Sequence, residues 1–79
     1  MTFAEYTGVE LRRWREQDGM SIQEAADKCF ICYATYGARE RHGISNLNIL
    51  QDTLDALEYD LHVFLECAMR NHKIYLSQR

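Results

Sequence analysis

The absence of proline is the feature that most constrains the fold of this 79-residue chain. Proline is the residue that breaks helices most strongly, and the chain has only four glycines as further punctuation. Such a sequence favours helices joined by short turns. Apolar residues make up 47% of the chain and charged residues 27%, a composition typical of a folded domain and not of a disordered segment. We therefore expect one all-α domain spanning residues 1–79.

Two capping boxes of the Ser/Thr-x-x-Glu type predict where the first two helices begin. The first box is TGVE at residues 7–10, and Gly19 is placed to end that helix as a left-handed cap. Leu11 and Trp14 form the buried face of this helix. The second box is SIQE at residues 21–24, and it predicts a second helix over residues 22–29.

Three more helices follow from periodicity and caps. We expect a helix over residues 33–41 that Gly43 terminates, and a fourth that Asn46 caps. The apolar positions 47, 50, 54, 57 and 61 keep the spacing of one buried stripe. Asp60 can cap a fifth helix. Residues 72–76 either extend it or form a short strand, since periodicity alone does not decide between the two. The expected core covers about 7–66, and residues 67–79 form a C-terminal extension.

Two short helices joined by a tight turn have the form of a helix-turn-helix. The chain resembles the lambda repressor and Cro-like (XRE) helix-turn-helix family over about 55 of its 79 residues, in the segments LRRWREQDGMSIQEAADKCFICYATYGARERHG and LNILQDTLDALEYDL. Arg15 and Glu40 stand where that family pairs an arginine of helix one with a glutamate of the recognition helix. Four positions depart from the family pattern. Ile22 replaces a glutamine, Phe30 a turn glycine, Cys32 a capping hydroxyl and Arg39 an apolar residue.

The resemblance implies a five-helix domain whose third helix enters the DNA major groove. The residues that it places against the bases are Tyr33, Ala34, Thr35, Gly37 and Ala38. It places the other DNA-binding residues mainly against the phosphate backbone: Gln23, Lys28, Arg39, Arg41 and His42. The amides of Asn46 and Asn48 would also contact phosphates. Tyr33 and Thr35 can hydrogen-bond, whereas Ala34 and Ala38 can only touch a thymine methyl or leave room for the base.

Two functions remain open at this point. The first is a small transcriptional regulator, such as a phage, plasmid or mobile-element repressor, that binds operator DNA as a homodimer. The expected dimer contacts are apolar residues of the last helix and the extension: Phe64, Leu65, Ala68, Met69, Tyr75 and Leu76. The alternative is a helix-turn-helix scaffold that contacts a protein, as an antitoxin or inhibitor does, with weak or no DNA binding. Its support is the net acidic charge and the uncharged face of the third helix.

Several other classes are not expected. The chain has no nucleophile arrangement and no glycine-rich phosphate loop, so we expect no enzyme activity and no cofactor. Cys29 and Cys32 lack a βαβ context, and a zinc site would have to recruit Cys67 and His72, so no metal is expected. An odd cysteine count and the lack of a long apolar run predict a cytoplasmic protein without a membrane segment.

The net charge of −3 comes from 12 acidic and 9 basic residues, and it is unevenly distributed. Residues 47–66 hold five acidic residues and no basic one, whereas residues 28–43 hold three basic residues and one acidic one. The overall charge therefore does not exclude a DNA-binding face on the third helix, although it predicts modest affinity.

Overall fold

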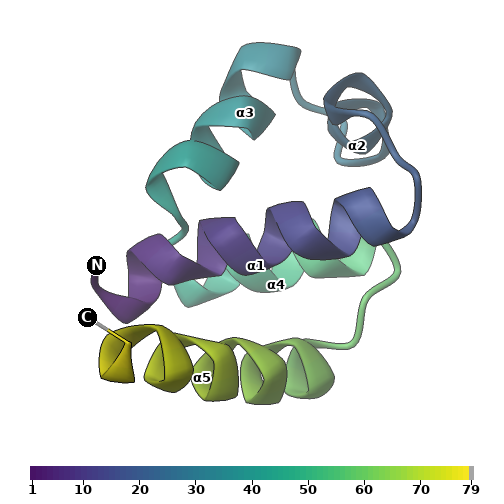
Figure 1. Ribbon diagram of the computed structural model, residues 1–79. Coiled ribbons are helices and arrows are strands. Elements are labelled where there is room, and N and C mark those ends of the chain that lie inside the picture. The colour runs from purple at the N-terminus through teal and green to yellow at the C-terminus, as the bar shows by residue number, and fades with distance from the viewer. Residues whose placement is uncertain (79) are drawn as a thin grey trace.

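The computed structural model describes residues 1–78, and these residues form five helices and no strand. The helices are α1 (Phe3–Gln17), α2 (Ile22–Lys28), α3 (Tyr33–His42), α4 (Leu47–Ala56) and α5 (Leu61–Ser77). In Figure 1, α2 and α3 lie on one side of α1 and α5 lies on the other, while the two ends of the chain lie close together. The prediction of an all-α fold with five helices is confirmed.

The start of α1 differs from the prediction. Thr2 is the N-cap, and it forms a capping box with Glu5 in which each side chain binds the backbone amide of the other residue. Thr7 lies inside the helix, and its hydroxyl accepts a hydrogen bond from the amide of Ile44 at 2.9 Å. The predicted start at Thr7 is therefore wrong, because this threonine satisfies a distant backbone group and not the first turn of α1.

The other predicted caps are confirmed. Ser21, Asn46 and Asp60 each accept a hydrogen bond from an amide in the first turn of the helix that follows. Gly19 and Gly43 adopt φ angles of 68° and 79° just after the ends of α1 and α3. L-residues reach this left-handed region at a cost, and glycine does not. Local sequence thus sets most of the helix boundaries.

The core lies between α1, α4 and α5 and reaches up to α2 and α3. Its fully or nearly buried apolar residues are Leu11, Ala25, Ala26, Tyr36, Ile44, Leu50, Leu54, Leu57, Phe64 and Ala68. Trp14 packs edge-on against Tyr59 and Phe64, with ring centroids 5.1 and 5.3 Å away. Leu47 breaks the predicted stripe because it is the first residue of α4 and remains 60% exposed.

Residues 72–76 continue α5 as a helix and do not form the short strand that was the alternative. His72 lies among aromatic rings: the Tyr6 centroid is 5.3 Å from its own and the Phe3 centroid 5.7 Å. Its ring nitrogen lies 3.0 Å from the carbonyl oxygen of Met1. Packing therefore continues past the expected 7–66 core at both ends. Among residues 1–78 there is no helix with the length and apolar character that a membrane span requires.

Candidate functional site

The exposed face of α3 is held in place by an ion pair between Arg15 of α1 and Glu40 of α3. Arg15 donates two hydrogen bonds to the carboxylate, at 2.7 and 3.1 Å, and a third to the carbonyl oxygen of Met20 at 2.8 Å. Only 7% of Arg15 and 9% of Glu40 are exposed. The hydrogen bond to Glu40 raises the pKa of Arg15, so the guanidinium stays charged. The expected link between the first and third helices is confirmed.

Two glycines let α1 and α3 approach each other closely. A Cβ atom at Gly8 would overlap the backbone carbonyl of Glu40, and one at Gly43 would overlap the carbonyl of Ala4. Neither obstacle is the end of a flexible side chain, so neither can move aside cheaply. The backbones of α1 and α3 therefore set the angle at which α3 stands on the domain.

The turn between α2 and α3 has an unusual residue at its tip. Phe30 adopts a φ of 57°, the left-handed conformation that favours glycine, and it is 95% exposed. The amide of Ile31 then bonds the carbonyl of Ala26 at 3.1 Å and closes the turn. Cys32 is the N-cap of α3 and makes no side-chain cap hydrogen bond to the backbone. The turn is thus tight and places an unpacked aromatic ring in solvent.

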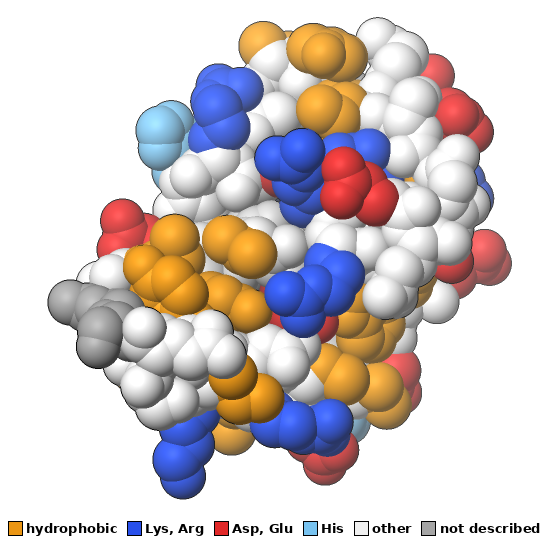
Figure 2. Space-filling view, viewed as in Figure 1, with side chains coloured by type: hydrophobic (Ala, Val, Ile, Leu, Met, Phe, Trp, Pro, Cys, Tyr) orange, Lys and Arg blue, Asp and Glu red, His pale blue; other side chains and the backbone are white. Residues whose placement is uncertain are grey.

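The predicted base-facing residues are not all at the surface. Tyr33 is 54% exposed, Ala34 and Thr35 are exposed, and Ala38 is partly exposed. Gly37 is buried, because the guanidinium of Arg41 lies only 3.2 Å from where a Cβ atom would stand. Gly37 is therefore covered by the Arg41 side chain and is not open to a base edge in this structure. In Figure 2, hydrophobic side chains cover the first turn of α3, and Lys and Arg side chains gather where α3 meets α1.

Several polar residues of the predicted DNA-binding set already have partners. Arg39 donates a hydrogen bond to the Thr53 hydroxyl at 2.8 Å, which ties α3 to α4. Gln23 bonds Asp27 on its own helix at 2.8 Å. The Thr35 hydroxyl lies 3.0 Å from the sulfur of Cys32. Within residues 1–78, Lys28, Arg41 and His42 form no ion pair.

Two hollows flank the exposed ridge of α3. The first, which we call the alanine hollow, has a volume of about 510 Å³ and is lined by Ala34, Thr35, Ala38, Arg39, His42 and Gly43. The second, the arginine hollow, has a volume of about 300 Å³ and is lined by Arg12, Arg15, Ile22, Tyr33, Gly37, Glu40 and Arg41. The first is largely apolar and the second is cationic, because its one carboxylate is already paired with Arg15.

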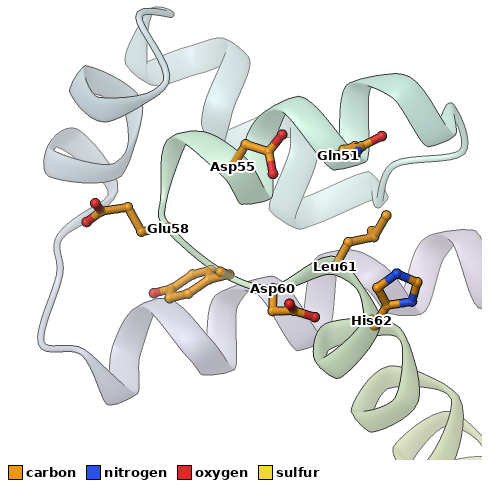
Figure 3. Close-up of a pocket in the computed structure, with 7 residues that line it drawn as sticks. Gln51, Asp55, Glu58, Asp60, Leu61 and His62 are labelled. Atoms are coloured by element: carbon orange, nitrogen blue, oxygen red, sulfur yellow. The ribbon is translucent and has the colours of Figure 1, made fainter.

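A separate acidic hollow of about 490 Å³ lies at the turn between α4 and α5. Asp55, Glu58, Asp60 and His62 are among its lining residues, and Figure 3 shows how they surround it. No residue of α3 lines it. Within the part of the chain that the structure describes, no cluster of His, Cys, Asp and Glu side chains could hold a metal ion. The acidic residues of this turn therefore lie apart from the hollows that α3 lines.

The three cysteines do not act together. Cys29 is half-buried, its sulfur lies 4.0 Å from the carbonyl of Thr53, and burial raises its pKa. Cys32 is exposed, and its hydrogen bond with the Thr35 side chain lowers its pKa. Cys67 lies on α5. The two thiols of the Cys-x-x-Cys segment thus have different surroundings.

Two of the expected dimer contacts are wrong. Phe64 and Ala68 are fully buried in the core of this one chain, so a second chain cannot reach them. Leu65 is half-buried, while Met69 is 56%, Tyr75 37% and Leu76 42% exposed. An apolar surface remains on α5, but it lies beside the face that packs against α1 and α4.

Sequence reasoning missed a buried carboxylate on α1. Glu10 is almost fully buried and accepts hydrogen bonds from Trp14 at 2.9 Å and from Asn71 of α5 at 3.0 Å. Arg13 lies 3.5 Å from the same carboxylate. The only local sign of these contacts is the spacing of three and four residues that puts Arg13 and Trp14 on the same helix face as Glu10. The contact with Asn71 has no local sign, because that residue is 61 positions away. This cluster joins α1 to α5.

Comparisons with protein-family models, curated proteins and solved structures find no significant match to this chain. We therefore infer the function from the side chains of this molecule and from the resemblance in the segments LRRWREQDGMSIQEAADKCFICYATYGARERHG and LNILQDTLDALEYDL.

Proposed function

We propose that this protein is a transcriptional regulator, of the repressor type found in phages, plasmids and mobile elements, that binds duplex DNA through α3. One observation carries the proposal: Glu40 is the only acidic residue of α3, and it is buried against Arg15. The basic residues that α3 leaves at least partly exposed are Arg39, Arg41 and His42. A rigid helix with exposed cations and no exposed acid suits the phosphate-lined major groove.

The arginine hollow supplies a place for a backbone phosphate. Arg41 has no ion-pair partner among residues 1–78, and Arg12 bonds only Glu16, at 3.2 Å in an exposed pair. An exposed pair is worth only ~0–1 kcal/mol, so a phosphate can compete with Glu16 at little cost. Contacts of this kind fix the position of the helix on DNA and carry no sequence information.

The salt dependence of binding tests the proposal. Fluorescence anisotropy of a labelled duplex should give binding at low micromolar protein in low salt, and log K should fall linearly with log salt concentration. Arg41→Gln should weaken binding and reduce the slope by about one. Arg70→Gln, an exposed arginine on α5, is the matched control and should leave the slope unchanged. A flat salt response, or no binding at low salt, contradicts the proposal.

The exposed flank of α5 supports a homodimer in this proposal. Leu65, Met69 and Leu76 lie on one flank at helical spacing. Two α5 helices crossing antiparallel near Met69 would place Glu66 of each chain beside Lys73 of the other, so that the charges complement each other. A dimer would engage two half-sites about one helical turn (~34 Å) apart.

Sedimentation equilibrium tests the dimer. The native chain should dimerise, and Met69→Lys should convert it to a monomer because a charge would be buried at the seam. Val63→Lys, which places the same charge on another exposed part of α5, should leave the dimer intact. A native chain that stays monomeric at high concentration would remove the dimer from the proposal and leave the DNA contact of α3 standing.

A second candidate function is a protein-binding scaffold, and the exposure of Phe30 and Tyr33 favours it. Phe30, at the tip of the α2–α3 turn, is 95% exposed, and Tyr33, the first residue of α3, is 54% exposed. Aromatic residues in such positions are common anchors of protein interfaces. If the chain ignores DNA at low salt but binds one protein stoichiometrically, and Tyr33→Ala abolishes that complex, this second function replaces the first.

A further inference from the structure

The alanine hollow lies on the part of α3 that the proposed function turns toward the bases. Ala34 and Ala38 are one helical turn apart and present only methyl groups. The nearby Thr35 hydroxyl is engaged by the sulfur of Cys32, and the Arg39 guanidinium is tied to Thr53. The two alanines have no side-chain donor or acceptor, so at Ala34 and Ala38 a base edge meets methyl groups alone, whereas Arg39 keeps further N–H groups besides the one bonded to Thr53.

We infer that the alanine hollow binds the C5-methyl group of thymine, so that the protein selects A·T pairs at this place in its site. This inference rests on the proposed DNA-binding function. Thymine is the only unmodified base that presents a methyl group in the major groove, and a small apolar side chain is the natural contact for it. A methyl group leaves water on entering the hollow, which favours binding without any hydrogen bond.

The charges around the hollow explain why its occupant is DNA and not an apolar protein side chain. Arg39 and His42 are among its lining residues, and Arg41 of the same helix lines the neighbouring arginine hollow. No acidic residue lines the alanine hollow. Alanine methyl groups next to an arginine match a base methyl group that lies near the phosphate backbone. A protein partner would have to bring acidic groups to these same positions.

The spacing of the two alanines predicts how many bases are read. Side chains four residues apart on a helix have Cβ atoms about 5–6 Å apart. That separation exceeds the ~3.4 Å between successive phosphates along the DNA axis. Ala34 and Ala38 therefore reach methyl groups on neighbouring base pairs, and each half-site should contain one or two thymines that are read by their methyl group.

The experiment removes the methyl group and nothing else. Duplexes that bind the full chain are selected from a random library, and each thymine of the selected site is then replaced in turn by deoxyuridine. At one or two positions per half-site, this change should weaken binding roughly fourfold, the value expected for one buried methyl group. Replacing cytosine by 5-methylcytosine at the same positions of a mutated site should recover part of the loss.

Protein variants assign the effect to the hollow. Ala34→Ser and Ala38→Ser place a hydroxyl against the methyl group, so deoxyuridine and thymine should then bind almost equally. Ala56→Ser, on α4, is the matched control and should keep the fourfold preference. If the native chain binds DNA with normal salt dependence but no position responds to deoxyuridine, this inference is overturned and the proposed function stands. If the chain does not bind DNA at all, both are overturned.

Discussion

Arg39 and Glu40 are adjacent in sequence, yet they tie α3 to two different helices. Arg39 bonds Thr53 of α4 at 2.8 Å, and Glu40 accepts two hydrogen bonds from Arg15 of α1. Neighbouring residues of a helix point about 100° apart, so the two bonds hold α3 from two sides. Both bonds lie in the second half of the helix. The orientation of α3 is therefore fixed by contacts in its second half, while Tyr33, Ala34 and Thr35 of its first turn remain exposed.

The ion pair should contribute strongly to stability. Glu40→Ala leaves the Arg15 charge buried without a partner, and we expect the free energy of unfolding to fall by about 3–5 kcal/mol. Urea denaturation measures the change. Glu16→Ala removes a carboxylate that pairs with Arg12 in solvent, and it should cost less than ~1 kcal/mol. Equal losses for the two variants would show that the Arg15–Glu40 pair behaves as if it were solvated.

The two glycines inside helices should respond to alanine with opposite signs. Gly8→Ala forces a Cβ atom against the Glu40 backbone, and separating the two helices should cost about 1–3 kcal/mol. At Gly37, by contrast, a new Cβ atom meets only the end of the Arg41 side chain, which can move aside. Helix propensity then dominates, and Gly37→Ala should stabilise the domain by about 0.5–1 kcal/mol. Thermal or urea unfolding of both variants checks the signs, and a shared sign would contradict the close approach at Gly8.

Local sequence predicted most of the helix ends correctly because the cap residues act within one turn. It failed at α1 because the Ser/Thr-x-x-Glu pattern occurs at both Thr2 and Thr7, and the pattern alone cannot rank them. Thr7 does not cap the helix because its hydroxyl accepts a hydrogen bond from the Ile44 amide, which is 37 positions away. Helix starts are thus predictable only where no tertiary contact competes for the capping side chain.

The surface of the candidate site was harder to predict than the fold. Periodicity identified Phe64 and Ala68 as apolar positions of α5, but it could not show what covers them. In the structure they are buried in the core of the same chain. On α3, Gly37 has the right spacing to face outward, yet Arg41 folds back over it. Burial of this kind depends on long side chains and on helices that are distant in sequence, so neither composition nor residue spacing predicts it.

Phe30 is a position where the native residue costs stability. An L-residue in the left-handed region costs roughly 1–2 kcal/mol, and the ring of Phe30 gains little packing in return because it is 95% exposed. Phe30→Gly removes this cost, and the greater freedom of glycine in the unfolded chain offsets part of the gain. We expect a net stabilisation of about 0.5–1 kcal/mol in urea denaturation. Phe30→Ser keeps the strain and is the control, so a similar gain there would mean that backbone strain is not the cause.

Cys32 should react with alkylating reagents at a lower pH than an ordinary thiol. The Thr35 hydroxyl lies 3.0 Å from its sulfur, and this hydrogen bond lowers the pKa of Cys32 because the hydroxyl can donate to the thiolate. The thiolate is the reactive form, so the midpoint of the rate against pH for iodoacetamide, followed by mass spectrometry, should lie below the ordinary thiol value. Thr35→Val removes this hydrogen bond and should move the midpoint upward. Cys29, whose pKa burial raises, is the internal control and should react more slowly in both proteins. An unchanged profile in Thr35→Val would show that the hydroxyl does not stabilise the thiolate.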